Sequence, residues 1–118
     1  MSIENTQIYI ELYSYKQAWV DLPSEDRQRF VSVVENAIAE IEKAGVKVIG
    51  FGLNDTNTDR RAAYDFFCVY EMPSAEFARL FEQQVEASGW YNYFEQINVS
   101  GTVKSPSEIL AENSHLSQ

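Results

Sequence analysis

The chain has 118 residues, of which 45% are hydrophobic and 23% are charged, the proportions of a globular protein rather than of a disordered one. Its 18 acidic and 9 basic residues give a net charge of −9. This charge argues against nucleic acid and anionic membranes as partners, because both are bound through clustered Lys and Arg. We therefore expect one domain over residues 1–118, with a single core and neither kind of partner.

The sequence shows none of the features that direct a chain out of the cytoplasm. No apolar run approaches the roughly 20 residues needed to span a bilayer. Residues 1–5 lack the basic and apolar regions of a signal peptide. Cys68 is the only cysteine, so no internal disulfide can form. These observations predict a cytoplasmic protein.

The first predicted element is a β-strand. Residues 8–13 alternate aliphatic side chains with Tyr9, Glu11 and Tyr13, which is the period of a strand. Large side chains on both sides predict that both faces of this strand are in contact with other parts of the protein. The connection that follows, residues 16–22, contains Trp19.

A helix and a hairpin are predicted next. Apolar residues at helical spacing predict an amphipathic helix over residues 24–44, which ends at Gly45. Residues 46–53 are predicted to form a strand in which Gly50 and Gly52 leave room for a bulge or a close approach. The polar residues 54–61 are predicted to form the tip of a hairpin.

The second half of the chain loosely repeats the first. Residues 63–72 are apolar on both sides, as in a central strand. Residues 74–88 predict a second amphipathic helix, which ends at Gly89. Residues 97–103 alternate as a last strand, and residues 107–116 predict a short helix or a frayed tail.

Every proline in the chain precedes a serine, and we expect each pair to open a helix. A serine oxygen can accept hydrogen bonds from the free N–H groups of a first helical turn, and an acidic residue there interacts well with the helix dipole. The pairs are Pro23-Ser24, Pro73-Ser74 and Pro106-Ser107, followed by Glu25, Glu76 and Glu108.

The order of elements is βαββαβ, which predicts an α+β fold of ferredoxin-like topology. Right-handed connections convert this order into a four-stranded antiparallel sheet with both helices on one face, over a core of residues 7–104. Residues 105–118 form a C-terminal tail. The other face of the sheet still carries aromatic and aliphatic side chains, and a partner sheet is its natural cover. We therefore expect a homodimer that packs sheet against sheet.

This order of elements over residues 7–104 resembles the dimeric α/β-barrel superfamily, in which two ferredoxin-like subunits pack sheet to sheet. A more specific similarity lies in residues 89–98 (GWYNYFEQIN) with Gly101, and in residues 9–12 (YIEL) with Trp19. These segments resemble the signature of a small uncharacterised bacterial family within that superfamily. The resemblance implies kinship but brings no known activity.

Better-known members of the superfamily include haem-degrading monooxygenases, cofactor-independent quinone-forming monooxygenases, isomerases and chlorite-dismutase-like haem proteins. The resemblance implies that a haem-degrading member has a histidine ligand on its second helix. Residues 74–89 contain no histidine, and His115 in the tail is the only one in the chain. The sequence also has no phosphate-binding loop and no paired Cys or His at metal-ligand spacing. We expect no cofactor and no metal site.

Glu11 is the candidate catalytic residue, because it lies in the middle of a strand between bulky neighbours. A carboxyl group in such a place has a raised pKa and can act as a general base on an acidic carbon or a phenol. The structural alternative is a glutamate at a dimer interface, hydrogen-bonded to tyrosine hydroxyls or paired with an arginine.

Aromatic and amide side chains are the candidate pocket residues. Rings with polar tips can stack on a flat ligand and hydrogen-bond to it, although such a cluster can also simply close one end of a core. An amide on the last strand can orient a carbonyl or stabilise an oxyanion, or it can face solvent. The candidates are Tyr9, Tyr13, Trp19, Trp90, Tyr93 and Asn98.

Three functions remain open on the sequence alone. The first is a homodimer that binds a small molecule between its helices and its sheet. The second is a cofactor-independent monooxygenase or isomerase that acts on an aromatic or enolisable compound with Glu11 as base. The third is a dimeric interaction module without a pocket. A void of a few hundred Å³ that reaches Glu11 favours the second, a void away from Glu11 the first, and a packed interior the third.

Overall fold

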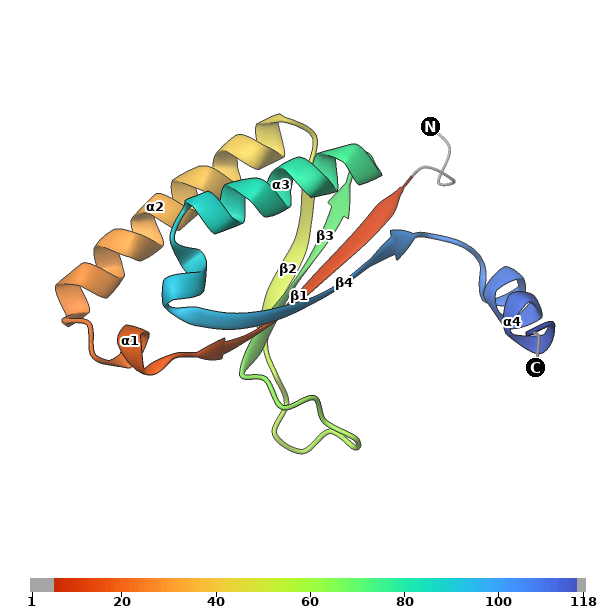
Figure 1. The fold of residues 1–118 in the computed structure, drawn as a ribbon, viewed down its shortest axis with the longest axis horizontal. Helices are drawn as coiled ribbons and strands as arrows, with labels where there is room; N and C mark the ends of the chain where they lie inside the picture. Colours follow the sequence, from red (N-terminus) through yellow and green to blue (C-terminus); the bar gives the residue numbers. More distant parts are fainter. Residues whose placement is uncertain (1–5, 117–118) are drawn as a thin grey trace.

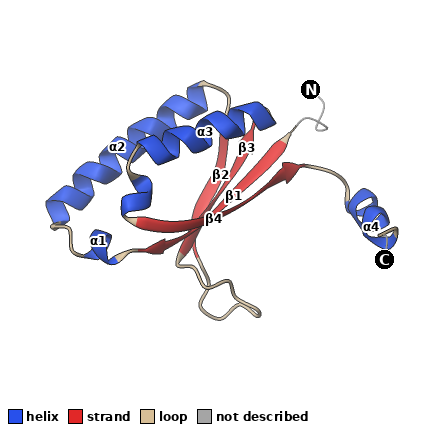
Figure 2. Ribbon diagram, in the orientation of Figure 1, coloured by secondary structure: helices blue, strands red, loops and turns tan. Residues whose placement is uncertain are grey.

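The computed structural model describes residues 6–116, which form an α+β fold (Figures 1 and 2). The sheet is built from β1 (Gln7–Tyr15), β2 (Lys47–Leu53), β3 (Phe66–Met72) and β4 (Phe94–Thr102). The helices are α1 (Gln17–Val20), α2 (Ser24–Lys43), α3 (Ala75–Ala87), the 3₁₀ turn η2 (Trp90–Asn92) and α4 (Pro106–Ser114).

The four strands form one open antiparallel sheet in the order β2-β3-β1-β4. β1 is therefore an inner strand, and its central residue Glu11 lies opposite Cys68 of β3 and Asn98 of β4. α2 and α3 lie side by side over one face of the sheet (Figure 1). The predicted sheet, and the predicted placement of both long helices on one face, are confirmed.

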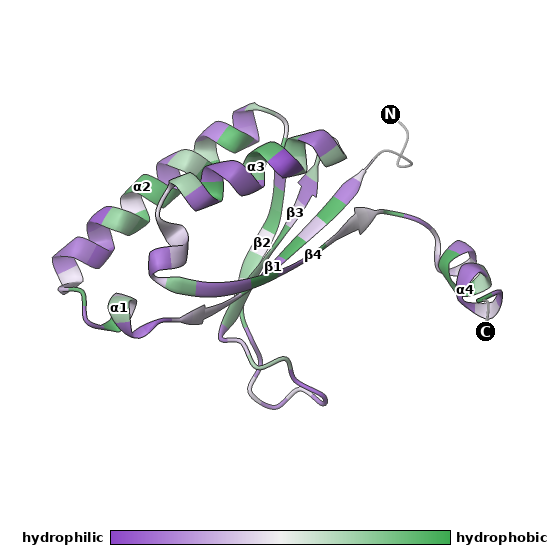
Figure 3. Ribbon diagram, in the orientation of Figure 1, coloured by the Kyte–Doolittle hydropathy of each residue, from purple (hydrophilic) through white to green (hydrophobic). Residues whose placement is uncertain are grey.

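The two faces of the sheet carry different side chains, because successive residues of a strand point to opposite sides. On β1, Tyr9, Glu11 and Tyr13 point to the helices and are buried. The residues between them point to the other face and are half-buried. Along α2 and α3, hydrophobic and hydrophilic residues alternate as in amphipathic helices (Figure 3).

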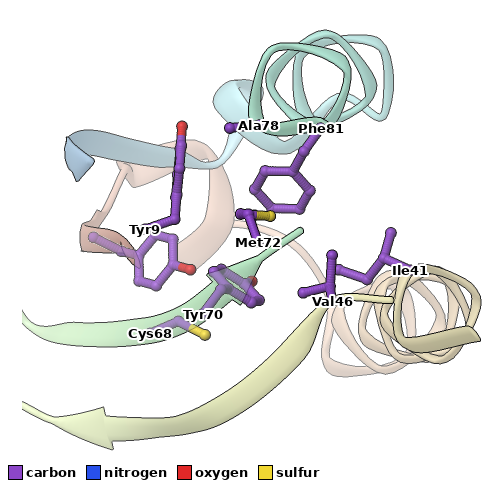
Figure 4. Close-up of a cluster of buried hydrophobic side chains, with 9 residues drawn as sticks. Tyr9, Ile41, Val46, Cys68, Tyr70, Met72, Ala78 and Phe81 are labelled. Carbon is purple, nitrogen blue, oxygen red and sulfur yellow. The ribbon is translucent and has the colours of Figure 1, made fainter. Parts of the chain in front are cut away.

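The core lies mainly between the sheet and α3. Phe81 of α3 packs edge-on against Tyr9, with ring centroids 5.5 Å apart, and against Tyr70, at 5.2 Å. Met72 of β3 and Ala78 of α3 complete this contact (Figure 4). Burial of these large side chains anchors α3 to the two inner strands.

A change of register in β2 places one further ring on the helix face. Pairing with β3 shifts between Val48 and Gly50, so that Val48 lies opposite Tyr70 and Phe51 lies opposite Cys68. Without this shift, strict alternation from Val48 would turn Phe51 to the other face. The bulge that the glycines suggest is therefore present, and it directs Phe51 towards the helices.

Several predicted boundaries are wrong by a few residues. β3 begins at Phe66 rather than at residue 63, because the chain before it belongs to the loop. β4 begins at Phe94, since its pairing with β1 extends to Tyr15. The connection over residues 16–22 contains the short helix α1. α4 forms a helix whose residues are all exposed, and it lies apart from the sheet (Figure 1).

The Pro-Ser pairs do open the helices, but the predicted capping role holds for one serine only. Ser74 precedes α3, and its side chain accepts a hydrogen bond from the Phe77 N–H at 3.0 Å. Ser24 is instead the first residue of α2, after Pro23, and it caps nothing. At α4, Ser105 is the cap and forms a capping box with Glu108.

This difference between two serines predicts different effects on stability. Ser74→Ala removes a cap and is expected to lower the free energy of unfolding by about 1 kcal/mol. Ser24→Ala is the matched control, and we expect a change below about 0.5 kcal/mol. Urea denaturation of both variants measures the two values. Equal losses in the two variants would contradict the assignment of Ser74 as the cap.

Candidate functional site

A cavity of about 110 Å³ lies between α2, α3 and the helix face of the sheet. Aliphatic side chains of the two helices form one part of its wall; they are Val33, Val34, Ala37, Ile38, Ile41 and Val85. Aromatic side chains of the sheet, the helices and η2 form another part; they are Tyr13, Phe30, Phe51, Tyr70, Phe81 and Trp90. Glu11 also lines this otherwise largely apolar space.

Glu11 reaches the cavity from the middle of β1. Its side chain is only 3% exposed, because the sheet lies behind it and the rings of neighbouring strands surround it. Tyr13, two residues further along β1, points the same way and donates its hydroxyl to Glu11 Oε1. Glu11 therefore faces the helices. The structural alternative, a glutamate in a sheet-to-sheet dimer interface, would instead place it on the open face of the sheet.

A chain of hydrogen bonds fixes the second oxygen of Glu11. Gln96 of β4 donates from Nε2 to Glu11 Oε2 at 2.7 Å, and its Oε1 accepts from the Trp90 indole at 2.8 Å. An indole N–H can only donate, so the amide oxygen of Gln96 must point to Trp90 and its nitrogen to Glu11. Gln96 Nε2 also lies 2.7 Å from Asn98 Oδ1.

Burial raises the pKa of Glu11 above its ordinary value, because the ionised form loses its hydration. Hydrogen bonds from Tyr13 and Gln96, with a contribution from the Tyr70 hydroxyl, oppose this rise. None of the ion pairs within residues 6–116 includes Glu11. Only neutral donors therefore stabilise the carboxylate, and it takes up a proton more readily than an exposed glutamate does.

The other ionisable groups near Glu11 stay protonated at neutral pH. Burial, together with the charge of Glu11, raises the pKa values of Tyr13 and Tyr70. Burial also raises the pKa of the Cys68 thiol to about 12. Cys68 is fully buried, so it is not a nucleophile available to a substrate. Glu11 is therefore the acidic group of this cluster that is available to exchange a proton.

The six predicted pocket residues are divided among three places. Tyr13 and Trp90 line the cavity together with Glu11. Trp19, and again Trp90, line a neighbouring groove of about 480 Å³. Tyr9, Tyr93 and Asn98 line neither space.

Packing explains the positions of these three residues. Tyr9 donates its hydroxyl to Glu82 of α3 at 2.8 Å and belongs to the core. Tyr93 packs edge-on against Trp19 and Phe30, with ring centroids 5.7 and 5.1 Å apart. Asn98 is exposed and reaches Glu11 only through Gln96.

Sequence reasoning missed several residues of the site. Gln96 shares the polar face of the last strand with Asn98 in the sequence pattern, but its direct hydrogen bond to Glu11 is not predicted by that pattern. Tyr70 was assigned only to an apolar strand, although its partner in register, Tyr9, is a neighbour of Glu11 on β1. Phe51 had no such signal, since its direction depends on the bulge in β2.

Within residues 6–116, no cluster of three or more His, Cys, Asp and Glu side chains is placed to hold a metal ion. None of the described helices has the length and apolar character that crossing a membrane requires.

The fold is an α+β fold with an open antiparallel sheet. An inner strand of that sheet presents a buried carboxyl group, hydrogen-bonded to uncharged donors, to a largely apolar cavity. The chain belongs to a family of unknown function (DUF6616), whose sequence model matches residues 6–116. No curated protein matches the chain in sequence.

The raised pKa of Glu11 predicts how stability depends on pH. The folded state holds the proton more tightly than the unfolded state, so this group stabilises the fold below about pH 4.5, and the contribution is lost as the pH rises through the folded pKa. Glu11→Gln removes this dependence and keeps the shape. We expect the variant to be as stable as the wild type or more stable at pH 7.

Urea denaturation between pH 4 and pH 8 measures this difference. Glu42→Gln, at an exposed position of α2, is the matched control for removal of one negative charge. The stability of the wild type relative to Glu11→Gln should fall with increasing pH, while the difference from Glu42→Gln should stay nearly constant. A relative stability that rises with pH would show that the fold favours the ionised form.

Proposed function

We propose that the protein binds a small molecule in the cavity between α2 and the sheet, as a homodimer of the dimeric α/β-barrel type. The observation that carries this proposal is the cavity itself, which is largely apolar and contains one fixed carboxyl network, with Gln84 and Ser88 of the α3 end as its other polar lining residues. Binding sites for small molecules are typically apolar spaces with a few converging polar groups. The strand order and the placement of both long helices on one face support the ferredoxin-like assignment.

The size of the cavity limits the ligand. An engineered apolar cavity of about 150 Å³ holds a benzene molecule, so a cavity of 110 Å³ suits a compound, or a part of one, no larger than a single ring. The neighbouring groove shares Phe30, Val34, Ile38, Phe51 and Trp90 with the cavity. A longer ligand can continue into this groove past the same side chains.

The criterion for the enzymatic alternative, a void of a few hundred Å³ that reaches Glu11, is met in position but not in size, since the cavity measures about 110 Å³. The cavity reaches Glu11, whose raised pKa suits a general base that removes a proton from a phenol or an enolisable carbon. A cofactor-independent monooxygenase or isomerase is therefore the second candidate function. The interaction module without a pocket is less well supported, because a packed interior would leave no cavity beneath α2.

The open face of the sheet supports the homodimer. Ile8, Ile10 and Leu12 of β1 are half-buried there, and Ile97 and Val99 of β4 are 47% and 59% exposed. Each Å² of apolar surface left in water costs about 25 cal/mol. A second copy of the same face is apolar over the same strands, and so it is a suitable cover.

We expect the wild-type protein to be a dimer at micromolar concentration in sedimentation velocity. Val99→Lys places a charge on the open face without touching the core, and it should shift the protein to monomer. Leu80→Lys is the matched control, because Leu80 is similarly exposed but lies on α3. A monomeric wild type, or equal dissociation in both variants, would contradict the sheet-to-sheet dimer.

Blocking the cavity tests the binding function. Ala37 and Ala39 are both exposed on α2, but only Ala37 lines the cavity. Ala37→Phe should abolish binding of small probes and, by filling the void, should leave stability unchanged or increased. Ala39→Phe should leave binding intact.

The measurement is the shift of backbone amide NMR signals on titration with phenol, benzoate and choline, which differ in charge. Saturable shifts with at least one probe, lost only in Ala37→Phe, are the expected result. Failure of all three probes, together with a more stable Ala37→Phe variant, would mean that the cavity is a packing defect.

A further inference from the structure

The cavity contains one carboxyl group, that of Glu11, which forms no ion pair among the residues that the structure describes. Glu11 is its only acidic lining residue, and no Lys, Arg or His lines it among the residues that the structure describes. The ion pairs of residues 6–116 lie on exposed helix and loop surfaces, such as Arg79 with Glu82 on α3. A buried carboxylate without a cation is costly, and its cost falls when an opposite charge lies beside it.

The neutral partners of Glu11 leave room for a further contact. A carboxylate has about four acceptor positions, and the direct hydrogen bonds from Tyr13 and Gln96 take one on each oxygen. The orientation of Gln96 is fixed by Trp90, so this amide cannot turn to offer an acceptor to a ligand. The polar floor of the cavity is thus arranged around a negative group.

The walls of the cavity suit a positive charge as well. Aromatic rings line it from the sheet, from both long helices and from η2, and they stand close to one another. Tyr13 and Trp90 meet edge-on at 5.3 Å, Phe30 and Trp90 stack at 6.1 Å, and Tyr70 and Phe81 meet at 5.2 Å. Aromatic rings attract ammonium groups through their negative faces, and six of them line this one space.

We propose that the cavity binds a small organic cation, a methylated ammonium group or a protonated amine, with Glu11 as its counter-ion and the surrounding rings as its cage. This inference rests on the proposed binding function and names the class of its ligand. A trimethylammonium group is about the size of a benzene ring and so suits a cavity of 110 Å³. The net charge of −9 also raises the local concentration of cations around the protein.

Anionic and neutral ligands fit the cavity less well than a cation. An anion would meet the Glu11 carboxylate in a space of low dielectric, where like charges repel strongly. A neutral compound of the same shape would fill the void but leave the carboxylate without a counter-ion. A cation fills the void and also neutralises Glu11. The charge of the ligand, rather than its shape, therefore decides which class of compound the cavity favours.

Choline and 3,3-dimethylbutan-1-ol test this inference on the wild-type protein, because they have the same shape and differ by the positive charge. Isothermal titration calorimetry at pH 7.5 should show saturable binding of choline. We expect the neutral alcohol to bind at least about tenfold more weakly. This comparison does not depend on the folding of any variant.

Variants then assign the effect to Glu11. Glu11→Gln should weaken choline binding by at least about tenfold and leave binding of the neutral alcohol nearly unchanged. Glu42→Gln, which removes one exposed charge from α2, should change choline binding by less than about twofold. A Glu11→Gln variant that binds choline as tightly as the wild type would overturn the role of Glu11 as counter-ion.

The failures of the two proposals are distinguishable. If the neutral alcohol or phenol binds as tightly as choline, and Ala37→Phe abolishes that binding, the cationic ligand class is wrong and the binding function stands. If benzoate binds in preference to choline, the ligand class is again wrong. If neither choline, the alcohol, phenol nor benzoate binds, both proposals are wrong.

Discussion

The hydrogen bond from the Trp90 indole to Gln96 is the contact on which the polar site depends. This bond fixes the orientation of the Gln96 amide, which therefore presents its N–H group to Glu11. Tyr13 can adapt, because a hydroxyl group donates to a carboxylate and accepts from a carboxylic acid. Glu11 can therefore gain or lose a proton while its partners stay in place. A left-handed glycine, Gly89 with φ +85°, ends α3 and sets the position of Trp90.

The sizes of the side chains explain why the space beneath α2 remains open. α3 reaches the sheet through Phe81, which packs directly on Tyr9 and Tyr70. α2 instead presents the smaller Val34, Ala37 and Ile38 to the region where Tyr13 and Phe51 project from the strands. Small side chains on the helix and large ones on the strands do not fill the volume between them. The fold thus keeps one helix tightly packed and places the cavity under the other.

Much of the fold could be predicted from local sequence patterns. Period-two alternation identified the first and last strands, and an apolar run identified β3. Helical spacing identified α2 and α3, and glycines marked the ends of both helices correctly. Strand boundaries were less accurate because the ends of β3 and β4 depend on pairing with β1, which no local pattern encodes. The role of Ser105 was predictable, because Ser105 and Glu108 have the Ser-x-x-Glu spacing of a capping box and Pro106 stands at the first helical position.

The site was predictable only in part. The position of Glu11 in a strand between tyrosines indicated a buried carboxyl group with a raised pKa, and the structure has this arrangement. Its partner Gln96, the ring of Phe51 and the separation of Tyr93 from the cavity depend on cross-strand register, on a bulge and on the packing of Trp19. These are contacts between residues far apart in the chain. Sequence patterns of short range carry no information about them.

Strand alternation also connects the site to the proposed assembly. Tyr9, Glu11 and Tyr13 point from β1 to the helices, while Ile8, Ile10 and Leu12 point from the same strand to the open face. A partner sheet over that face would remove water from the back of the strand that carries Glu11. The surroundings of the carboxylate would then become less polar, and the free energy gained by pairing it with a cation would increase. In the proposed dimer, closing one face of β1 therefore strengthens the binding of a cation at the other.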